Sequence, residues 1–132
     1  RDVERSRGLG DVYKRQVMAD ALEICETFAD GELDLIVSNP PYIKSADIET
    51  LQKEVQLEPR LALDGGEDGC DFYREIVSRW SRKLKKGGAL AFELGENQAD
   101  AVKALMAEQG FSDFKISLDF GGVQRAIIGT LL

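Results

Sequence analysis

The sequence predicts an α/β fold: part of a doubly wound, mostly parallel sheet, followed by an antiparallel hairpin at the C-terminal end. Two short apolar runs, Leu33–Ser38 and residues 89–94, have the composition of buried strands. A helical pattern over residues 71–86 separates them and is long enough for a right-handed crossover, so we expect the two strands to be parallel neighbours. Segments 114–120 and 125–131 flank a glycine-rich turn, which predicts the hairpin.

The N-terminal part has little regular pattern. Residues 1–16 carry scattered charges, two glycines and no sustained periodicity, which predicts a poorly ordered arm or a segment foreign to the domain. The domain is therefore expected over residues 17–132, and residues 17–20 are interpreted as the end of a buried strand. A short helix is expected within residues 43–57, and the turn residues of 58–69 predict a loop.

The best-specified helix is expected to begin with Asp71 as its cap. Its apolar positions share one face and are expected in the core: Phe72, Ile76, Val77, Trp80 and Leu84. Lysines and a pair of glycines near residue 86 predict its end. The second strand is then expected to stop at Gly95, before a helix over residues 97–109.

Composition restricts the chemistry. The 132 residues include no histidine, which excludes Ser-His-Asp and Cys-His nucleophiles, HExxH metalloproteases and Cys₂His₂ zinc sites, and no metal site is predicted. Cys25 and Cys70 form no CxxC pattern and are interpreted as inert thiols in a reducing cytoplasm. No apolar run approaches the roughly 20 residues of a membrane helix. The net charge of −7 makes direct binding of nucleic acid unexpected.

The segment Asn39-Pro40-Pro41-Tyr42 follows the first predicted strand, at the edge where open α/β sheets bind ligands. Each proline fixes its φ at about −65° and the pair biases Asn39 to an extended conformation, so the Asn39 side chain and the Pro40 carbonyl are expected to be held as converging acceptors. A planar NH₂ group offers two donors, and Tyr42 supplies a ring face. The pattern predicts a site for a carboxamide or an aromatic amine, with a simple strand-ending turn as the alternative.

An amide nitrogen is a weak nucleophile because its lone pair is delocalised, so it needs a strong electrophile such as a methyl sulfonium. Acceptors on both N–H groups would position the nitrogen and favour the positive charge that it gains. This chemistry requires neither a metal nor a histidine, in agreement with the composition.

Four segments together resemble the C-terminal half of the peptide chain release factor glutamine N5-methyltransferases: residues 33–42, 58–69, 87–95 and 119–125. The resemblance covers about residues 17–131. It implies a class I S-adenosylmethionine-dependent methyltransferase fold of the Rossmann-like type, S-adenosylmethionine as methyl donor, and the glutamine of the release factor's Gly-Gly-Gln loop as acceptor.

The same resemblance implies roles for individual residues. Asn39 and Pro40 would hold the acceptor amide, Tyr42 would pack on it with Pro41 beside it, and Asn39 would also line the cofactor pocket. Asp20 and Ala21 match the family's contact near the adenine. No segment before residue 17 resembles the family's glycine-rich cofactor turn, so we expect the chain to be an incomplete catalytic domain.

Several alternatives remain open at this point. Glu93 is a candidate base, although a role in orienting the loop is favoured, and residues 58–69 are expected to cover the acceptor site rather than to react. Arg125 is expected to pair with the carboxylates of that loop rather than with substrate. For the function, the alternatives are methylation of a ribosomal-protein glutamine, adenine N6-methylation of nucleic acid, and a truncated chain without catalytic activity.

Overall fold

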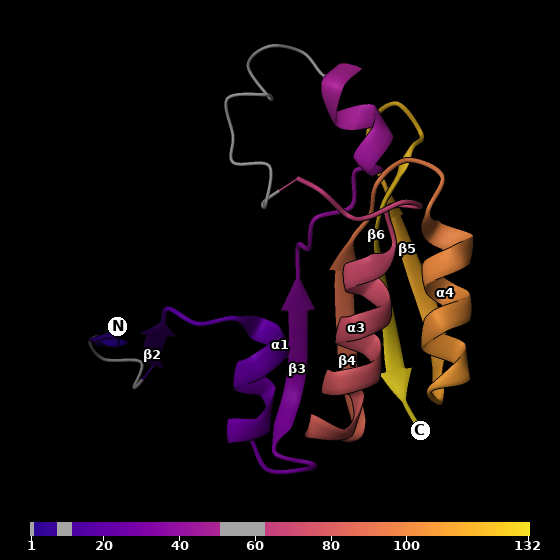
Figure 1. The fold of residues 1–132 in the computed structure, drawn as a ribbon. Coiled ribbons are helices and arrows are strands. Elements are labelled where there is room, and N and C mark those ends of the chain that lie inside the picture. The colour runs from indigo at the N-terminus through magenta and orange to yellow at the C-terminus, as the bar shows by residue number, and fades with distance from the viewer. Residues whose placement is uncertain (1, 8–11, 51–62) are drawn as a thin grey trace.

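The computed structural model describes residues 2–7, 12–50 and 63–132. Its main element is a four-stranded sheet with the strand order β3-β4-β6-β5 (Figure 1). The strands are β3 (Leu33–Ser38), β4 (Leu84–Glu93), β5 (Phe111–Leu118) and β6 (Gln124–Leu131). β3 and β4 pair in parallel, as predicted, whereas β6 pairs antiparallel with both β4 and β5. The sheet is therefore mixed. The predicted hairpin consists of β5 and β6, and β5 is an edge strand of the sheet.

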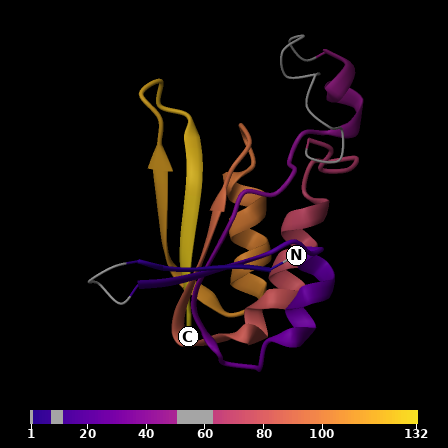
Figure 2. The same ribbon diagram turned by 90° about the vertical axis from the view of Figure 1, so that its left-hand side faces the viewer.

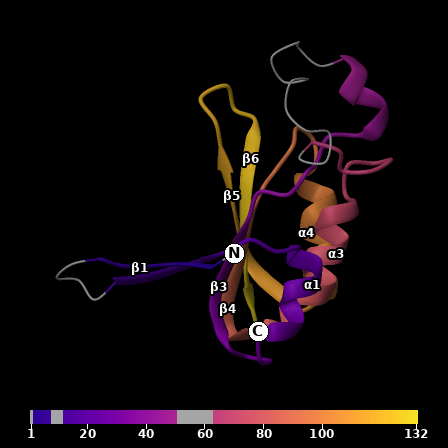
Figure 3. The same ribbon diagram turned by 60° about the vertical axis from the view of Figure 1, so that its left-hand side comes forward.

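The described α-helices lie on one face of this sheet (Figure 3). They are α1 (Ala21–Ile24), α3 (Asp71–Trp80) and α4 (Ala99–Glu108), with 3₁₀ turns at Cys25–Thr27, Ser45–Thr50 and Ser81–Lys83. Within residues 43–57, where a short helix is expected, the structure has the 3₁₀ turn at Ser45–Thr50. Residues 51–57 lie outside the described residues. In the part of the chain that the structure describes, no helix is long and apolar enough to cross a membrane.

The core lies between α3, α4 and the two central strands. Tyr73 is fully buried and meets the Phe92 ring edge-on, with 5.1 Å between the ring centroids. Phe72, Ile76 and Val77 belong to this core or pack against it, as their helical spacing predicts. Trp80 lies at its margin, where its indole nitrogen donates to the Ala21 carbonyl at 2.9 Å.

The ends of α3 differ from the prediction. Asp71 is not the cap: it stands in the first turn, and Cys70 occupies the cap position without a side-chain hydrogen bond. The helix stops at Trp80, and Leu84 is a buried strand residue rather than part of the helical face. The basic residues that suggested a longer helix lie in the 3₁₀ turn and at the start of β4, where Lys85 and Lys86 are exposed to solvent.

The glycine pair near residue 87 forms a β-bulge instead of a helix end. Leu33 pairs with Leu84 and Leu35 pairs with Ala89, so the extra residues of β4 bulge between these positions. Gly87 has a φ of +85°, and a Cβ on Gly88 would lie 3.0 Å from the Asp34 carbonyl oxygen. Both positions therefore favour glycine, one for its backbone angle and the other for its close neighbour.

The strand β3 is less buried than its apolar sequence predicts. It forms one edge of the four-stranded sheet, and Leu35 and Val37 are 53% and 71% exposed. Ile36 and Leu33 face the helices and pack against the core. An apolar run predicts a strand that is covered on both faces, but the described elements cover only one face of β3.

The N-terminal segment forms a hairpin of its own, outside the four-stranded sheet. β1 (Asp2–Arg7) and β2 (Val12–Val17) pair antiparallel as a separate hairpin that projects from the sheet (Figure 2). Backbone pairing in such a hairpin does not require an apolar periodicity, which is why the sequence did not reveal it. Residues 17–20 are not the end of a buried strand, since Val17 and Met18 are 44% and 81% exposed.

Candidate active site

A small cavity lies at the carboxyl end of β3, where the chain leaves the sheet. Its volume is about 150 Å³ and its lining residues come from three segments: Asn39, Pro40, Pro41, Tyr42, Ile43, Leu63 and Glu93. The carboxyl ends of β3 and β4 meet at this cavity, because Glu93 is the last residue of β4. The whole predicted tetrapeptide lines this cavity.

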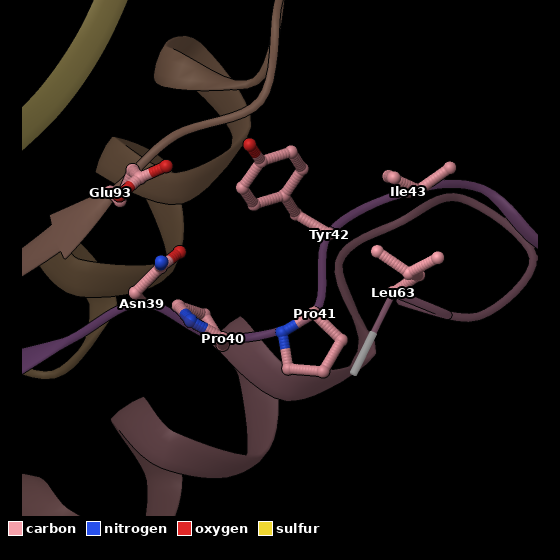
Figure 4. A pocket seen from close by; sticks show the side chains of 7 residues that line it. All are labelled: Asn39, Pro40, Pro41, Tyr42, Ile43, Leu63 and Glu93. Carbon is pink, nitrogen blue, oxygen red and sulfur yellow. The ribbon is translucent and has the colours of Figure 1, made fainter. Parts of the chain in front are cut away.

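Three polar side chains face the same space. Asn39, Tyr42 and Glu93 point toward one another, while Pro40 and Pro41 lie along one side (Figure 4). Asn39 is exposed, Tyr42 is half-buried and Pro40 is buried. The two prolines leave the chain little rotational freedom at the strand end, so the positions of the flanking side chains are set by the backbone.

The Tyr42 hydroxyl has a raised pKa. Burial is the main cause, followed by the negative charge of the nearby Glu93. The nearby Arg125 guanidinium acts in the opposite direction. Tyr42 is therefore a neutral phenol at physiological pH, and its ring presents an apolar face beside polar neighbours.

The glycine-rich segment after residue 62 is hydrogen-bonded to Ile43, the residue that follows the tetrapeptide. Ile43 donates its backbone N–H to the Leu63 carbonyl at 3.1 Å, and its own carbonyl accepts from the Gly65 N–H at 2.7 Å. Ile43 and Asp64 also form an isolated parallel bridge. Ser45 adds a side-chain hydrogen bond to Asp64 at 2.5 Å. Leu63 is held against the cavity by this pairing, and the rest of the predicted cover, residues 58–62, lies outside the described residues.

Arg125 pairs with a carboxylate other than the predicted ones. Its Nε lies 3.0 Å from Asp119 Oδ2, whereas the expectation was a carboxylate of the loop at 58–69. The turn between β5 and β6 brings these two residues together, and the same Asp119 accepts from the backbone N–H groups of Gly121 and Val123. A salt bridge is therefore present, but within the hairpin.

Asp20 and Ala21 stand apart from the cavity. Asp20 is the N-cap of α1, and its carboxylate accepts from the Leu22 N–H at 2.8 Å. Both residues are exposed and neither lines the cavity. The structure thus brings Asn39, Pro40, Pro41 and Tyr42 together and leaves the predicted adenine contact outside this group.

Two residues around the cavity, Ile43 and Gln98, were not predicted from the sequence, whereas Leu63 belongs to the predicted cover. Ile43 and Leu63 line it, and the buried Gln98 donates its amide to the Tyr42 carbonyl at 2.9 Å. An apolar residue beside a proline-rich turn has no distinguishing signal. A glutamine three residues after Gly95 at a helix start resembles any solvated polar residue until the contacts are known.

The volume of the cavity limits the size of the ligand that it can enclose. Sites that enclose a drug-sized molecule span about 300–1,000 Å³, whereas this cavity measures about 150 Å³. It accommodates a side-chain amide and a small group beside it. A molecule of the size of S-adenosylmethionine fits only with its reactive end in this cavity and its remainder held by residues beyond it.

No protein-family model matches the chain. It is 49% identical over 107 residues to a release factor glutamine methyltransferase of Geobacter sulfurreducens, a match over 80% of this chain and 38% of that protein. The corresponding protein of Caulobacter vibrioides is 46% identical over 97 residues, which is 73% of this chain and 34% of the relative. The chain therefore spans little more than a third of the length of these relatives.

Solved structures agree with the fold class. A release factor-specific protein-(glutamine-N5) methyltransferase from Alicyclobacillus acidocaldarius superposes with a TM-score of 0.51 at 30% identity, over 83% of this chain and 54% of that one. A methyltransferase from Pyrococcus furiosus gives a TM-score of 0.52 at 21% identity, which supports the fold alone. The fold is the Rossmann-like fold of class I methyltransferases. Over the part that it shares with these relatives, the chain belongs to the release factor glutamine methyltransferase family.

Proposed function

We propose that the protein carrying this chain transfers a methyl group from S-adenosylmethionine to the side-chain amide nitrogen of a glutamine in a peptide chain release factor. The observation that carries the proposal is the cavity formed by Asn39, Pro40, Pro41 and Tyr42 at the carboxyl end of β3. Its volume suits a carboxamide, and the relatives named above supply the reaction and the acceptor.

In this proposal the acceptor amide is held by its two N–H groups. The Asn39 side-chain oxygen and the Pro40 carbonyl accept one each, and the Tyr42 ring packs against the amide plane. Holding both N–H groups fixes the direction of the nitrogen and stabilises the positive charge that it gains during transfer. Both acceptors belong to the segment whose backbone the two prolines restrict, which supports an arrangement that is set before the substrate binds.

S-adenosylmethionine, when bound, supplies the electrophilic methyl group. Asn39 is the residue placed to contact both partners, since it is the member of the tetrapeptide nearest the sheet. Asp20 and Ala21 are proposed as the contact near the adenine; both are exposed at the start of α1. The carboxylate of Asp20 has one oxygen engaged with the Leu22 N–H.

The proposed partner is the Gly-Gly-Gln loop of a release factor, which places the protein in translation termination and in the cytoplasm. Both cysteines are free thiols, as is common in a reducing compartment. The surface has a net charge of −7, which favours a protein substrate over direct contact with nucleic acid.

A chimeric enzyme tests the proposal. In it, the part of this chain that matches the Geobacter sulfurreducens relative replaces the corresponding 107-residue segment of that protein. We expect labelled methyl groups to pass to a purified release factor and mass spectrometry to locate them on the glutamine of the Gly-Gly-Gln loop. A release factor with alanine in place of that glutamine is the control substrate. A folded chimera that leaves the release factor unlabelled, or that labels a ribosomal protein instead, would overturn the proposal.

A further inference from the structure

Gln98 lies beneath the cavity at the cap position of α4, and it is 9% exposed. Its side-chain oxygen accepts from the Gly95 N–H at 2.9 Å and from the Tyr73 hydroxyl at 3.3 Å. Its side-chain nitrogen donates to the carbonyls of Tyr42 at 2.9 Å and of Gly69 at 3.3 Å. All four partners are protein groups, so both the oxygen and the nitrogen of this amide are hydrogen-bonded within the protein.

The partners of Gln98 belong to three segments of the chain. Tyr42 ends the tetrapeptide, Gly69 belongs to the glycine-rich segment, and Gly95 follows the last residue of β4. They are separated along the chain, and no single helix or strand holds them together. One side chain therefore contacts the segment that binds the acceptor, the segment over it and the end of the neighbouring strand, and it adds to the backbone hydrogen bonds that Ile43 makes with Leu63 and Gly65.

The glycines around Gln98 show how closely these segments pack. A Cβ on Gly69 would lie 2.5 Å from the Tyr42 carbonyl oxygen, and one on Gly95 would lie 2.7 Å from Cδ1 of the Tyr42 ring. A Cβ on Gly65 would lie 2.7 Å from the Tyr42 Cα. Because three separate glycines approach Tyr42 in this way, a small shift of the tyrosine produces collisions on several sides.

We infer that Gln98 is a positioning residue of the acceptor site: through the Tyr42 carbonyl it fixes the tyrosine ring against which the acceptor glutamine packs. This inference rests on the proposed function. Gln98 lies outside the lining of the cavity and touches no reacting atom, so its effect passes through Tyr42. The side-chain nitrogen carries this effect, because it is the group that donates to the carbonyls of Tyr42 and Gly69. The side-chain oxygen accepts only from Gly95 and Tyr73, on the side of the core.

Gln98→Glu separates these two halves. Glutamate keeps the shape and an acceptor for Gly95 and Tyr73, but it replaces the donor to Tyr42 and Gly69 by an oxygen that repels both carbonyls. Gln109→Glu makes the same chemical change at an exposed position at the end of α4 and is the matched control.

The first measurement uses the 132-residue chain alone and does not depend on catalysis. In nuclear magnetic resonance spectra we expect contacts between the Tyr42 ring and Gly95 in the parent and in Gln109→Glu, and their loss in Gln98→Glu. Contacts between Tyr73 and Phe92 report on the core and are expected to persist. Persistence of the Tyr42–Gly95 contacts in Gln98→Glu would overturn the inference.

The second measurement uses the chimera. Gln98→Glu is expected to lower kcat/KM for the release factor at least about tenfold while KM for S-adenosylmethionine changes by less than about twofold, because misplacement of a positioning group affects the partner that it orients. Parental kinetics, or an equal rise of both KM values, would overturn the inference.

A variant without charge covers the case in which Gln98→Glu does not fold. Gln98→Asn keeps the amide but shortens its reach, and the same loss of Tyr42–Gly95 contacts with an intact core is expected. Retention of these contacts in Gln98→Asn would likewise overturn the inference. If the parent chimera transfers no methyl group, the proposed function fails, whereas the spectra of the chain still decide the role of Gln98.

Discussion

The Tyr73 hydroxyl donates to the backbone carbonyl of Glu93 at 2.7 Å. Tyr73 lies on α3 in the centre of the core, and Glu93 is the last residue of β4, with its side chain in the cavity. A fully buried side chain thus fixes the backbone from which a cavity residue projects. The packing of α3 on the sheet and the geometry of the site are joined by this contact.

Tyr73→Phe is expected to destabilise the fold. The change removes a partly buried hydrogen bond to the Glu93 carbonyl, and the loss of such a bond costs about 0.5–1.5 kcal/mol. Urea unfolding of the chain measures the difference. Ser78→Ala removes a hydroxyl from the exposed side of the same helix and is expected to change stability by less than about 0.5 kcal/mol. Equal stabilities of the two variants would contradict the role assigned to this hydrogen bond.

Asn39→Ala is expected to slow methyl transfer by the chimera about 100-fold, since one lost hydrogen bond in the transition state is worth about 3 kcal/mol. Its side chain is exposed at the strand end, so the thermal melt is expected to stay near that of the parent. Single-turnover rates with saturating enzyme and donor measure the effect. Asn39→Asp keeps an acceptor oxygen and is expected to retain more activity than Asn39→Ala. A parental rate for Asn39→Ala would refute the assignment.

Gly95→Ala is expected to displace Gln98 or the Tyr42 ring and to destabilise the fold. The added methyl group would lie 2.6 Å from Gln98 Oε1 and 2.7 Å from the Tyr42 ring, so one of them must move. Overpacking of this kind costs about 1–3 kcal/mol. Gly121→Ala, whose nearest neighbour is the flexible Asp119 carboxylate at 3.3 Å, is the control in thermal melts of the chain. Similar melting temperatures for both variants would show that the contact at Gly95 relaxes without cost.

Stability is expected to fall in alkaline solution. Burial raises the pKa of both Tyr42 and Tyr73, and it also raises the pKa of the Cys70 thiol. In the unfolded chain these groups ionise near pH 10 for tyrosine and about 8.5 for cysteine. The folded chain keeps protons that the unfolded chain loses, so the free energy of unfolding declines above these values and is unaffected by these groups below them. Urea unfolding at stepped pH measures the slope, and Tyr42→Phe is expected to reduce it. A slope unchanged in Tyr42→Phe would contradict the raised pKa.

The chain by itself is expected to associate through β3. Leu35 and Val37 are exposed on this edge strand, and exposed apolar edges promote pairing between chains. Val37→Lys is expected to shift sedimentation profiles toward the monomer. Ala104→Lys adds the same charge to the exposed side of α4 and is expected to leave the profile unchanged. An identical distribution for parent and Val37→Lys would exclude β3 as the associating surface.

Local pattern was sufficient for much of the fold. The apolar run of β3, the helical spacing around Ile76 and the glycine-flanked hairpin each carry their own structural preference, because period and turn chemistry act over a few residues. The order of these elements then predicted the parallel pairing of β3 with β4. Local pattern failed at the lysine-rich start of β4, because lysines occur both at helix ends and on exposed strands. The structure has a strand there instead of the expected helix end.

The position of the candidate site and the residue types in it could be predicted from the sequence. Asn39 to Tyr42 are contiguous and follow a strand, so both their convergence and their position at the sheet edge follow from the backbone. Their surroundings follow from the tertiary fold: Glu93 lies beside Tyr42, Leu63 lines the same cavity, and Gln98 donates to the Tyr42 carbonyl. These residues come from other strands, loops and helices, and their contacts depend on long-range packing that no local pattern encodes. The same holds for Arg125, which takes Asp119 as its partner because the hairpin turn, not the charge pattern, fixes the distance.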